Sequence, residues 1–237
     1  AGTRNPPRRR VLDAPVIVAL SGAHGTCSMR SMPAATDARD CIVFDFETTG
    51  LSPDSGDRAI EIGAVRLQSG VVVDKFQALM NPGIEIPAFI EEYTGIHNSM
   101  LADARDAARV MRDFAAFAGD QNLVAHNASF DRRFLAAELD RVGVQLSGEV
   151  ACSMLAARRL FQDAPDHKLG TLVRHLALPN EGAFHRALAD AEMTAHLWLA
   201  EVQALERRGA KGVTFTTMMR LCRTSRYDVA TFVERCR

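Results

Sequence analysis

The sequence predicts an α/β layered domain over residues 39–208. Two observations predict this fold class. Three strand-like segments come first, and short strands then alternate with helix-like segments, which is the pattern of a sheet covered by helices. Hydrophobic residues make up 47% of the 237-residue chain, which is enough apolar surface for a sizeable core.

The first half of the domain reads as three strands. The run from Cys41 to Phe46 is a continuous apolar segment of the kind found in buried strands, and it ends at acidic residues. Gln68-Ser69-Gly70 forms a turn between the next two strands, and the proline and glycine residues of 51–57 and 82–87 mark irregular connections. The expected strands are 41–46, 59–67 and 71–80.

The second half alternates between the two periods. Apolar residues at helical spacing predict helices, and two short apolar runs between them predict the remaining strands. The expected helices are 104–118, 129–142, 153–161, 169–176 and about 186–207. The expected strands are 122–126 and 150–152.

The two ends of the chain differ from this domain. Residues 1–38 contain two adjacent prolines and three adjacent arginines and sustain no period, so we expect a mobile N-terminal extension. Residues 209–237 carry apolar residues at loosely helical spacing, which predicts a short helical C-terminal tail that packs on the core.

Composition excludes some classes of protein. The net charge of −1 is unlike that of strongly basic nucleic-acid-binding domains, although clustered acids would lower it. Five cysteines with no C-x-x-C pair argue against a disulfide scaffold or a zinc site and predict reduced thiols in a cytoplasmic protein. The apolar runs are too short for a membrane span, so no membrane partner is expected.

Asp45 and Glu47 form the first candidate site. Residues two apart on a strand point to the same face, so both carboxylates project together while Phe44 and Phe46 turn the other way. Neighbouring carboxylates repel each other, and a divalent cation removes that conflict. Their place at the carboxyl end of a buried strand is the usual ligand edge of an α/β sheet. Acids at a solvated strand end are the simpler alternative.

Two further groups follow along the chain. Asp131 lies in the first turn of a predicted helix, where it could face this edge or merely complement the helix dipole, and Asn127 before it could reach a phosphate. His185 and Asp190 are five residues apart, which is about 140° on a helix, so both cannot share a helical face. We therefore place His185 on the loop before the helix and Asp190 inside it, although each could instead be a surface residue.

The three groups together resemble the DEDD exonuclease superfamily in its histidine-bearing branch. The resemblance covers about residues 41–202 and is strongest to DnaQ-like proteins such as the epsilon subunit of bacterial DNA polymerase III. The matching stretches are 45–51 (Asp-Phe-Glu-Thr-Thr-Gly-Leu), 59–65, 93–96, 126–131 (His-Asn-Ala-Ser-Phe-Asp), 168–172 and 185–190 (His-Arg-Ala-Leu-Ala-Asp).

The resemblance implies a ribonuclease H-like fold with a mixed five-stranded sheet flanked by helices. It also implies 3′→5′ exonuclease activity with two divalent cations, Mg²⁺ or in its place Mn²⁺, which stabilise the attacking and leaving oxygens of a phosphodiester. Asp45, Glu47 and Asp190 would hold one cation. Asp131 would support a second one that Asp45 bridges, and His185 would take the proton of the attacking water.

Substrate contacts follow from the same resemblance. The backbone near Thr48 and the side chain of Leu51 would cradle the terminal nucleotide, with Leu51 wedged against the last base unless it is a core residue. Lys168, Arg132 and Arg186 flank the motifs and are either phosphate contacts or solvated charges. The expected partners are nucleic-acid 3′ ends and a DNA polymerase subunit if the enzyme proofreads. The sequence leaves the oligomeric state open.

Three functions remain open at this point. The first is a DNA exonuclease that stands alone or proofreads. The second is an RNA exonuclease similar to ribonuclease T or oligoribonuclease, but the pair Thr48-Thr49 departs from oligoribonuclease-like proteins, which usually have methionine in the first place. The third is an inactive polymerase or clamp adaptor, which the presence of all five site residues disfavours.

Overall fold

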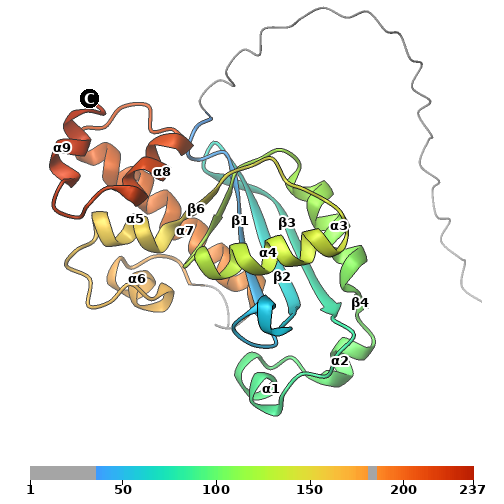
Figure 1. The fold of residues 1–237 in the computed structure, drawn as a ribbon. Coiled ribbons are helices and arrows are strands. Elements are labelled where there is room, and N and C mark those ends of the chain that lie inside the picture. The colour runs from blue at the N-terminus through green and yellow to red at the C-terminus, as the bar shows by residue number, and fades with distance from the viewer. Residues whose placement is uncertain (1–35, 181–185) are drawn as a thin grey trace, which may run out of the picture. The chain divides into compact units, whose positions relative to one another are not determined.

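The computed structural model describes residues 36–180 and 186–237 (Figure 1). The predicted extension up to residue 35 and the candidate base His185 lie outside the described residues. The described residues all lie in one compact unit of the chain.

The fold is an α/β domain built on one mixed sheet, which confirms the predicted fold class (Figure 1). The sheet order is β4-β3-β2-β1-β5-β6. β1 pairs antiparallel with β2, and β2 pairs antiparallel with β3. β5 and β6 run parallel to β1. The strands are β1 (Cys41–Thr48), β2 (Ala59–Gln68), β3 (Val71–Asn81), β4 (Arg105–Asp106), β5 (Leu123–Ala125) and β6 (Val150–Cys152).

The described sheet has six strands instead of the expected five. The additional strand is β4, which pairs with the end of β3 over two residues only. Both residues of β4 are polar and exposed, so they produce no apolar pattern that a sequence could reveal. The predicted helix 104–118 also began too early, because α3 starts at Ala107 with Asp106 as its N-cap.

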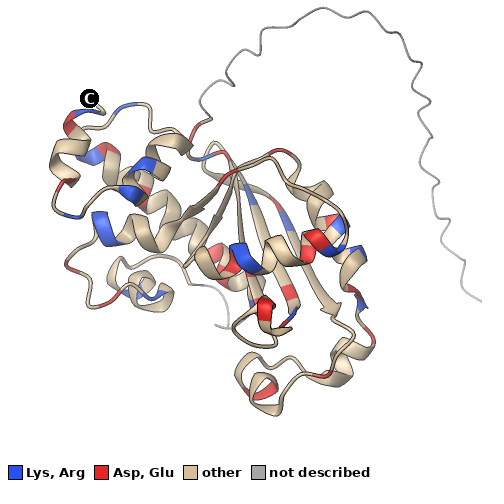
Figure 2. Ribbon diagram, in the orientation of Figure 1, with Lys and Arg blue, Asp and Glu red and all other residues tan. Residues whose placement is uncertain are grey.

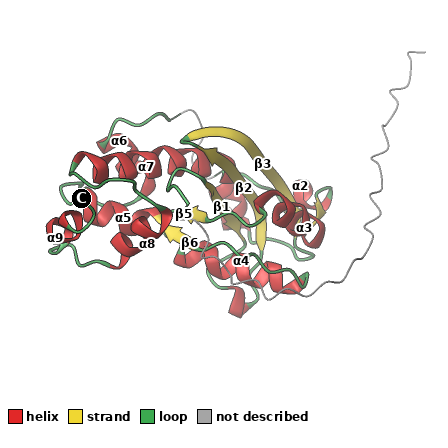
Figure 3. Ribbon diagram, turned by 90° about the horizontal axis from the view of Figure 1, so that it is seen from above, coloured by secondary structure: helices red, strands yellow, loops and turns green. Residues whose placement is uncertain are grey.

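Helices cover both faces of the sheet (Figure 3). Phe44 and Phe46 of β1 pack in the same cluster as apolar residues of α3 and α4, whereas Cys41 and Val43 pack with residues of α5 and α7. The strand period therefore puts Asp45 and Glu47 on the α7 side. The covering helices are α3 (Ala107–Ala118), α4 (Ser129–Arg141), α5 (Ser153–Leu160), α6 (Leu169–His175) and α7 (Ala187–Arg207).

Three short elements were not predicted. They are η1 (Pro53–Ser55), α1 (Ala88–Thr94) and α2 (Asn98–Ala102). Each is at most seven residues long, so too few turns exist to show a helical period. α1 and α2 pack through Ile90 and Leu101 around Ile60 of β2, next to the end of β1.

The C-terminal residues form α8 (Phe215–Arg223) and α9 (Val229–Glu234). They pack in the same cluster as Trp198 and Val202 of α7, and Trp198 contacts Phe215 with 5.9 Å between ring centroids. Ala38 is fully buried in this cluster, and its carbonyl accepts a hydrogen bond from Trp198 Nε1 at 2.8 Å. Ala38 and the tail therefore share one core with the domain.

Composition also led to expectations about the cysteines and about membrane-spanning helices. Among the described cysteines, Cys41, Cys152, Cys222 and Cys236 are free thiols. Within the ranges that the structure describes, no helix combines the length and apolarity that a membrane crossing requires.

Candidate active site

Three carboxylates meet at the carboxyl end of β1. Oxygen atoms of Asp45, Glu47 and Asp190 all lie within 4.8 Å of one another. Asp45 and Glu47 come from the strand, and Asp190 comes from the first turn of α7, which crosses the same face of the sheet. The structure therefore brings together residues that are 145 positions apart and that the sequence predicted as one site.

Asp131 joins this cluster from the other side of the strand. It lies in the first turn of α4 and is only 2% exposed. Its Oδ1 accepts a hydrogen bond at 3.2 Å from the backbone N–H of Phe46, which belongs to the peptide group that joins Asp45 to Phe46. Asp131 is thus fixed against the strand end by the backbone itself.

The start of α7 is docked on β2 by two features. Gly63, which pairs with Asp45 in the sheet, has no room for a side chain, because a Cβ there would lie 2.1 Å from the backbone nitrogen of Leu188. Glu61 is fully buried, and its carboxylate accepts two hydrogen bonds from the Arg186 guanidinium, at 2.8 and 3.1 Å, and one from Ala187 N at 3.2 Å. These contacts place Asp190 within reach of the strand.

The pairing of Arg186 changes one expectation. Arg186 was a candidate phosphate contact, but its guanidinium is engaged by Glu61. Arg186 also lowers the pKa of Glu47 as the smallest of several influences on that residue. This ion pair fixes Arg186 against β2 at the start of α7.

Burial and mutual repulsion disfavour the ionised form of each carboxylate in the cluster. Burial, followed by the charges of Asp131, Asp190 and Glu47, holds the pKa of Asp45 well above its usual range. Burial and then Asp190 raise the pKa of Glu47 to about 8, and burial raises that of Asp131 to about 7. A hard divalent cation bound by these oxygens would relieve the repulsion, so this donor set fits Mg²⁺ or Mn²⁺.

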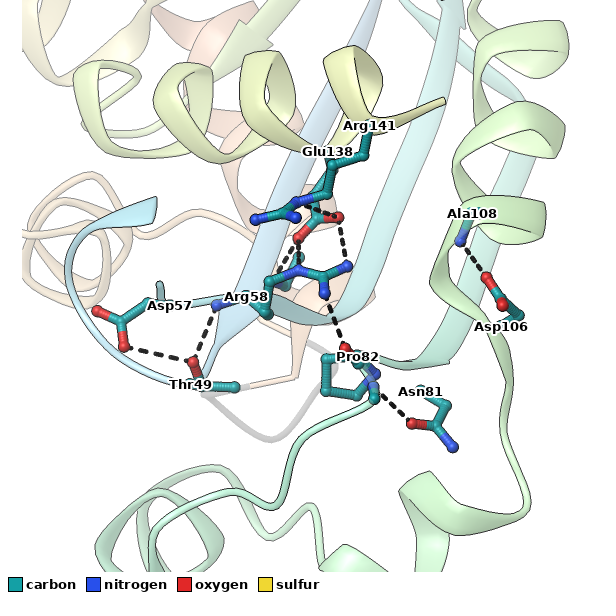
Figure 4. A network of polar contacts seen from close by, with 11 residues as sticks. Thr49, Asp57, Arg58, Asn81, Pro82, Asp106, Ala108, Glu138 and Arg141 are labelled. Carbon is teal, nitrogen blue, oxygen red and sulfur yellow. Dashed lines mark hydrogen bonds and ion pairs between the residues drawn. The ribbon is translucent and has the colours of Figure 1, made fainter. Parts of the chain in front are cut away.

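A polar network holds the loop after β1 (Figure 4). Arg58 donates to both oxygens of Glu138 on α4, at 2.7 and 2.9 Å, and to the carbonyl of Pro82 at 2.8 Å. The backbone N–H of Arg58 donates to Thr49 Oγ1 at 2.9 Å, which ties the loop to β2. The network therefore links the loop after β1, the helix that carries Asp131 and the segment that leads to α1.

The carboxylates open onto a cavity of about 460 Å³. One wall is acidic and consists of Asp45, Glu47 and Asp190. The rest of the lining is mostly apolar and comes from the end of β1 and the loop after it, from α1 and from the start of α4. The residues of this apolar wall are Phe46, Thr48, Gly50, Leu51, Phe89, Ile90, Tyr93, Thr94 and Phe130. A cavity with one acidic and one apolar wall can hold a phosphate and a base or sugar at the same time.

The predicted substrate residues fall into two groups. Thr48 and Leu51 line the cavity, and Leu51 is 77% exposed, so the alternative that it is a core residue is wrong. Asn127 is exposed in a left-handed conformation with φ of 62° and is not among the lining residues. Phe89 and Phe130 were missed for different reasons. Phe89 is an exposed residue of α1, which is too short to show a helical period, and Phe130 is half-buried at the start of α4, where it packs on Phe134.

The fold and this carboxylate cluster define the class of the protein as a ribonuclease H-like nuclease. Comparison with known proteins agrees. The model of a protein family described as exonuclease, of the ribonuclease T type, matches residues 42–198. The chain belongs to this family of 3′–5′ exonucleases, so the predicted family is confirmed.

Curated relatives refine this assignment. The chain is 38% identical over 173 residues to a DNA polymerase III PolC-type protein of Caldanaerobacter subterraneus, and 38% identical over 193 residues to a DNA polymerase III subunit epsilon-like protein of Rhodobacter capsulatus. These matches cover 73% and 80% of the chain but only 12% and 27% of the two relatives. The chain thus corresponds to a small part of each relative.

Solved structures agree with the fold. Exonuclease X in complex with 5′-overhanging duplex DNA is 28% identical, with a TM-score of 0.62 over 77% of this chain and 99% of that one. The nuclease domain of 3′hExo, a DEDDh family member bound to rAMP, is 19% identical with a TM-score of 0.57, over 70% and 92% of the two chains. The second likeness concerns the fold alone.

Proposed function

We propose that this protein hydrolyses phosphodiester bonds from the 3′ end of single-stranded or frayed DNA in a metal-dependent reaction. The observation that carries the proposal is the meeting of Asp45, Glu47 and Asp190 within 4.8 Å, beside a cavity with an apolar wall. Such a site binds a strand end through its last nucleotide and its scissile phosphate. Phosphate contacts position a strand without reading its sequence, so we expect little sequence preference.

The proposed roles follow from position. Asp45, Glu47 and Asp190 would hold the cation that activates water, and Asp131 would support a second cation shared with Asp45. Two bound divalent ions would stabilise the charge that develops on the attacking and leaving oxygens. Leu51 and the backbone near Thr48 would position the terminal nucleotide, and Asn127 would contact a phosphate. His185 would accept the proton of the attacking water, a role suited to an imidazole with a pKa near neutrality.

DNA is the preferred substrate in this proposal. The pair Thr48-Thr49 differs from the pattern of oligoribonuclease-like proteins, the curated relatives are named as DNA polymerase III proteins, and Exonuclease X is in complex with DNA. We further propose that the enzyme either stands alone or associates with a DNA polymerase. The inactive adaptor is disfavoured, because the chain retains all four carboxylates at one site.

A degradation assay tests the proposal. Labelled single-stranded DNA, mismatched duplex DNA and RNA are compared in Mg²⁺, Mn²⁺ and EDTA. We expect shortening of the DNA from its 3′ end with either metal and none in EDTA. Faster cleavage of RNA than of either DNA substrate would overturn the choice of substrate, and unchanged cleavage in EDTA would overturn the role of metal.

Variants test the residues in the same assay. Asp190→Asn should abolish cleavage, and His185→Ala should lower kcat by roughly 10² to 10⁴, the usual contribution of a general base. Asp140→Asn is the matched control, because Asp140 is an exposed acid at the far end of α4. Wild-type turnover by Asp190→Asn would contradict the assignment.

A further inference from the structure

Positive charge is concentrated at the C-terminal end of the chain. Residues 207–237 carry eight basic and two acidic side chains, a net charge of +6 in a chain whose total is −1. All eight basic residues of this segment are exposed. The proposed active site is the opposite, because it gathers acids, and Arg186 beside it is engaged by Glu61. A basic region elsewhere on the surface would add electrostatic attraction for a polyanion.

The C-terminal ends of α5 and α8 meet in this basic region (Figure 2). Arg159 Nε donates to the carbonyl of Thr224 at 2.9 Å, and Gln162 Nε2 donates to the carbonyl of Arg226 at 2.9 Å. These bonds hold the segment after α8 against the end of α5. Exposed side chains stand at this junction or next to it in the sequence, and we call them the α5–α8 basic surface. They are Arg158, Arg223, Arg226 and Tyr227.

Tyr227 gives this surface an aromatic face. Its side chain is 79% exposed, and the guanidinium of Arg226 lies 4.7 Å from the centroid of its ring. Single-stranded nucleic acids are bound by this combination, in which cations contact phosphates and aromatic rings stack on bases. An acidic protein partner would use the cations but would have no need of an exposed ring.

α5 connects this surface to the edge of the sheet that carries the carboxylates, because it begins directly after β6. β1, β5 and β6 are parallel neighbours, so their carboxyl ends lie along one edge. α5 begins there at Ser153, whose Oγ lies 2.8 Å from Nδ1 of His126 at the end of β5. Burial is the main cause that lowers the pKa of His126 to about 4. The positive charge of Arg158 lowers this pKa further, which places Arg158 near His126. From this edge α5 extends eight residues, about 12 Å.

Cations at the ends of helices also have a structural explanation. Arginines in a last turn interact favourably with the helix dipole, and Arg158, Arg159 and Arg223 all lie in last turns. Arg159 is half-buried and donates to the carbonyls of Leu155 and Thr224, so it is left out of the surface. Arg158 and Arg223 are exposed, and Arg226 lies beyond the end of α8, where no helix dipole requires it.

We propose that the α5–α8 basic surface binds the phosphate backbone of the nucleic-acid strand upstream of the 3′ end that enters the active site. Tyr227 offers a base of that strand a stacking face. This inference rests on the proposed exonuclease function and adds the part of the protein that holds the rest of the substrate. If the α5–α8 basic surface binds the upstream strand, affinity for long strands depends on residues that do not touch the reacting phosphate.

The test uses the full chain and two substrates. One is a 20-nucleotide single-stranded DNA, and the other is the p-nitrophenyl ester of thymidine 5′-monophosphate, which has no upstream strand. The variant is Arg223→Gln/Arg226→Gln. The matched control is Arg109→Gln/Arg112→Gln, which removes two exposed arginines from α3. Binding of the 20-nucleotide strand is also measured by fluorescence anisotropy in EDTA at several salt concentrations.

We expect the variant to raise KM for the 20-nucleotide strand about tenfold at low salt, with kcat and the ester reaction unchanged. The slope of log affinity against log salt should flatten by about 1.4, because each phosphate contact on a single strand contributes about 0.7. The control should behave as wild type. Wild-type affinity and a wild-type salt slope in the variant would overturn this inference and would favour an acidic protein as the partner of the surface. Absence of hydrolysis by the wild type would instead count against the proposed function, while anisotropy would still test the surface.

Discussion

Replacement of Gly63 by alanine tests how the site is assembled. The new Cβ would lie 2.1 Å from Leu188 N and 2.2 Å from the carbonyl carbon of Ala187. Both are backbone atoms of the first turn of α7, so no side-chain rotation relieves the contact. Normal contact requires a separation near 3.4 Å. The start of α7 must therefore move by about 1 Å, and Asp190 moves with it.

A displacement of about 1 Å in a catalytic group can cost roughly 10² in rate. We therefore expect Gly63→Ala to lower kcat about 100-fold on single-stranded DNA and to shift half-maximal activation to higher Mn²⁺ concentration. Strain of this kind also destabilises the fold, by about 1–3 kcal/mol. Val202→Ala is the control, because it removes buried apolar contacts far along α7 and should reduce stability without loss of kcat. Wild-type kcat in Gly63→Ala would refute the argument that this close contact positions Asp190.

Two further predictions concern buried charges. Glu201 on α7 is fully buried, its two carboxylate oxygens have no hydrogen-bond partner among the described residues, and burial holds its pKa well above the usual range. In the folded protein the Glu201 carboxyl therefore stays neutral, whereas in the unfolded chain it ionises as pH rises above about 4.5, so burying it costs more stability at higher pH. Glu201→Met removes this cost and should raise Tm more at pH 8 than at pH 5. Equal increases at the two pH values would contradict this argument. Glu138 is almost fully buried against Arg58, so Glu138→Ala should lower the free energy of unfolding by roughly 3–5 kcal/mol in urea titrations. Arg58→Met/Glu138→Met should lose less than that, and an additive loss would argue against the pair acting as a unit.

Local patterns in the sequence predicted much of the site. The alternation along β1 predicted that Asp45 and Glu47 share a face opposite to Phe44 and Phe46, and the packing of the strand confirms it. The five-residue spacing predicted that Asp190 lies inside a helix whose start follows His185, and α7 begins at Ala187. Periodicity is sufficient for such inferences because it depends only on the local geometry of the chain.

Contacts between distant segments were beyond the reach of the same patterns. Gly63 and Glu61 appeared only as parts of a predicted strand and of a stretch that matches the family, with no role of their own, yet they dock α7 and thereby place Asp190. Arg186 was expected to be either a phosphate contact or a solvated charge, and neither expectation included its bond to Glu61. Short elements such as α1 gave no period, so the wall that Phe89 contributes to the cavity was not expected.

The sequence by itself thus determined the family, the order of the main strands and helices and the face of β1 on which Asp45 and Glu47 lie. Only the tertiary structure decided which of these residues meet, how closely α7 approaches β2 and what surrounds the carboxylates. The physical reason is that side-chain direction follows from backbone geometry within one element, whereas a distance between elements depends on the packing of all the residues between them. The carboxylate cluster needs both, because β1 supplies the direction of Asp45 and Glu47, and the contact at Gly63 brings Asp190 to them.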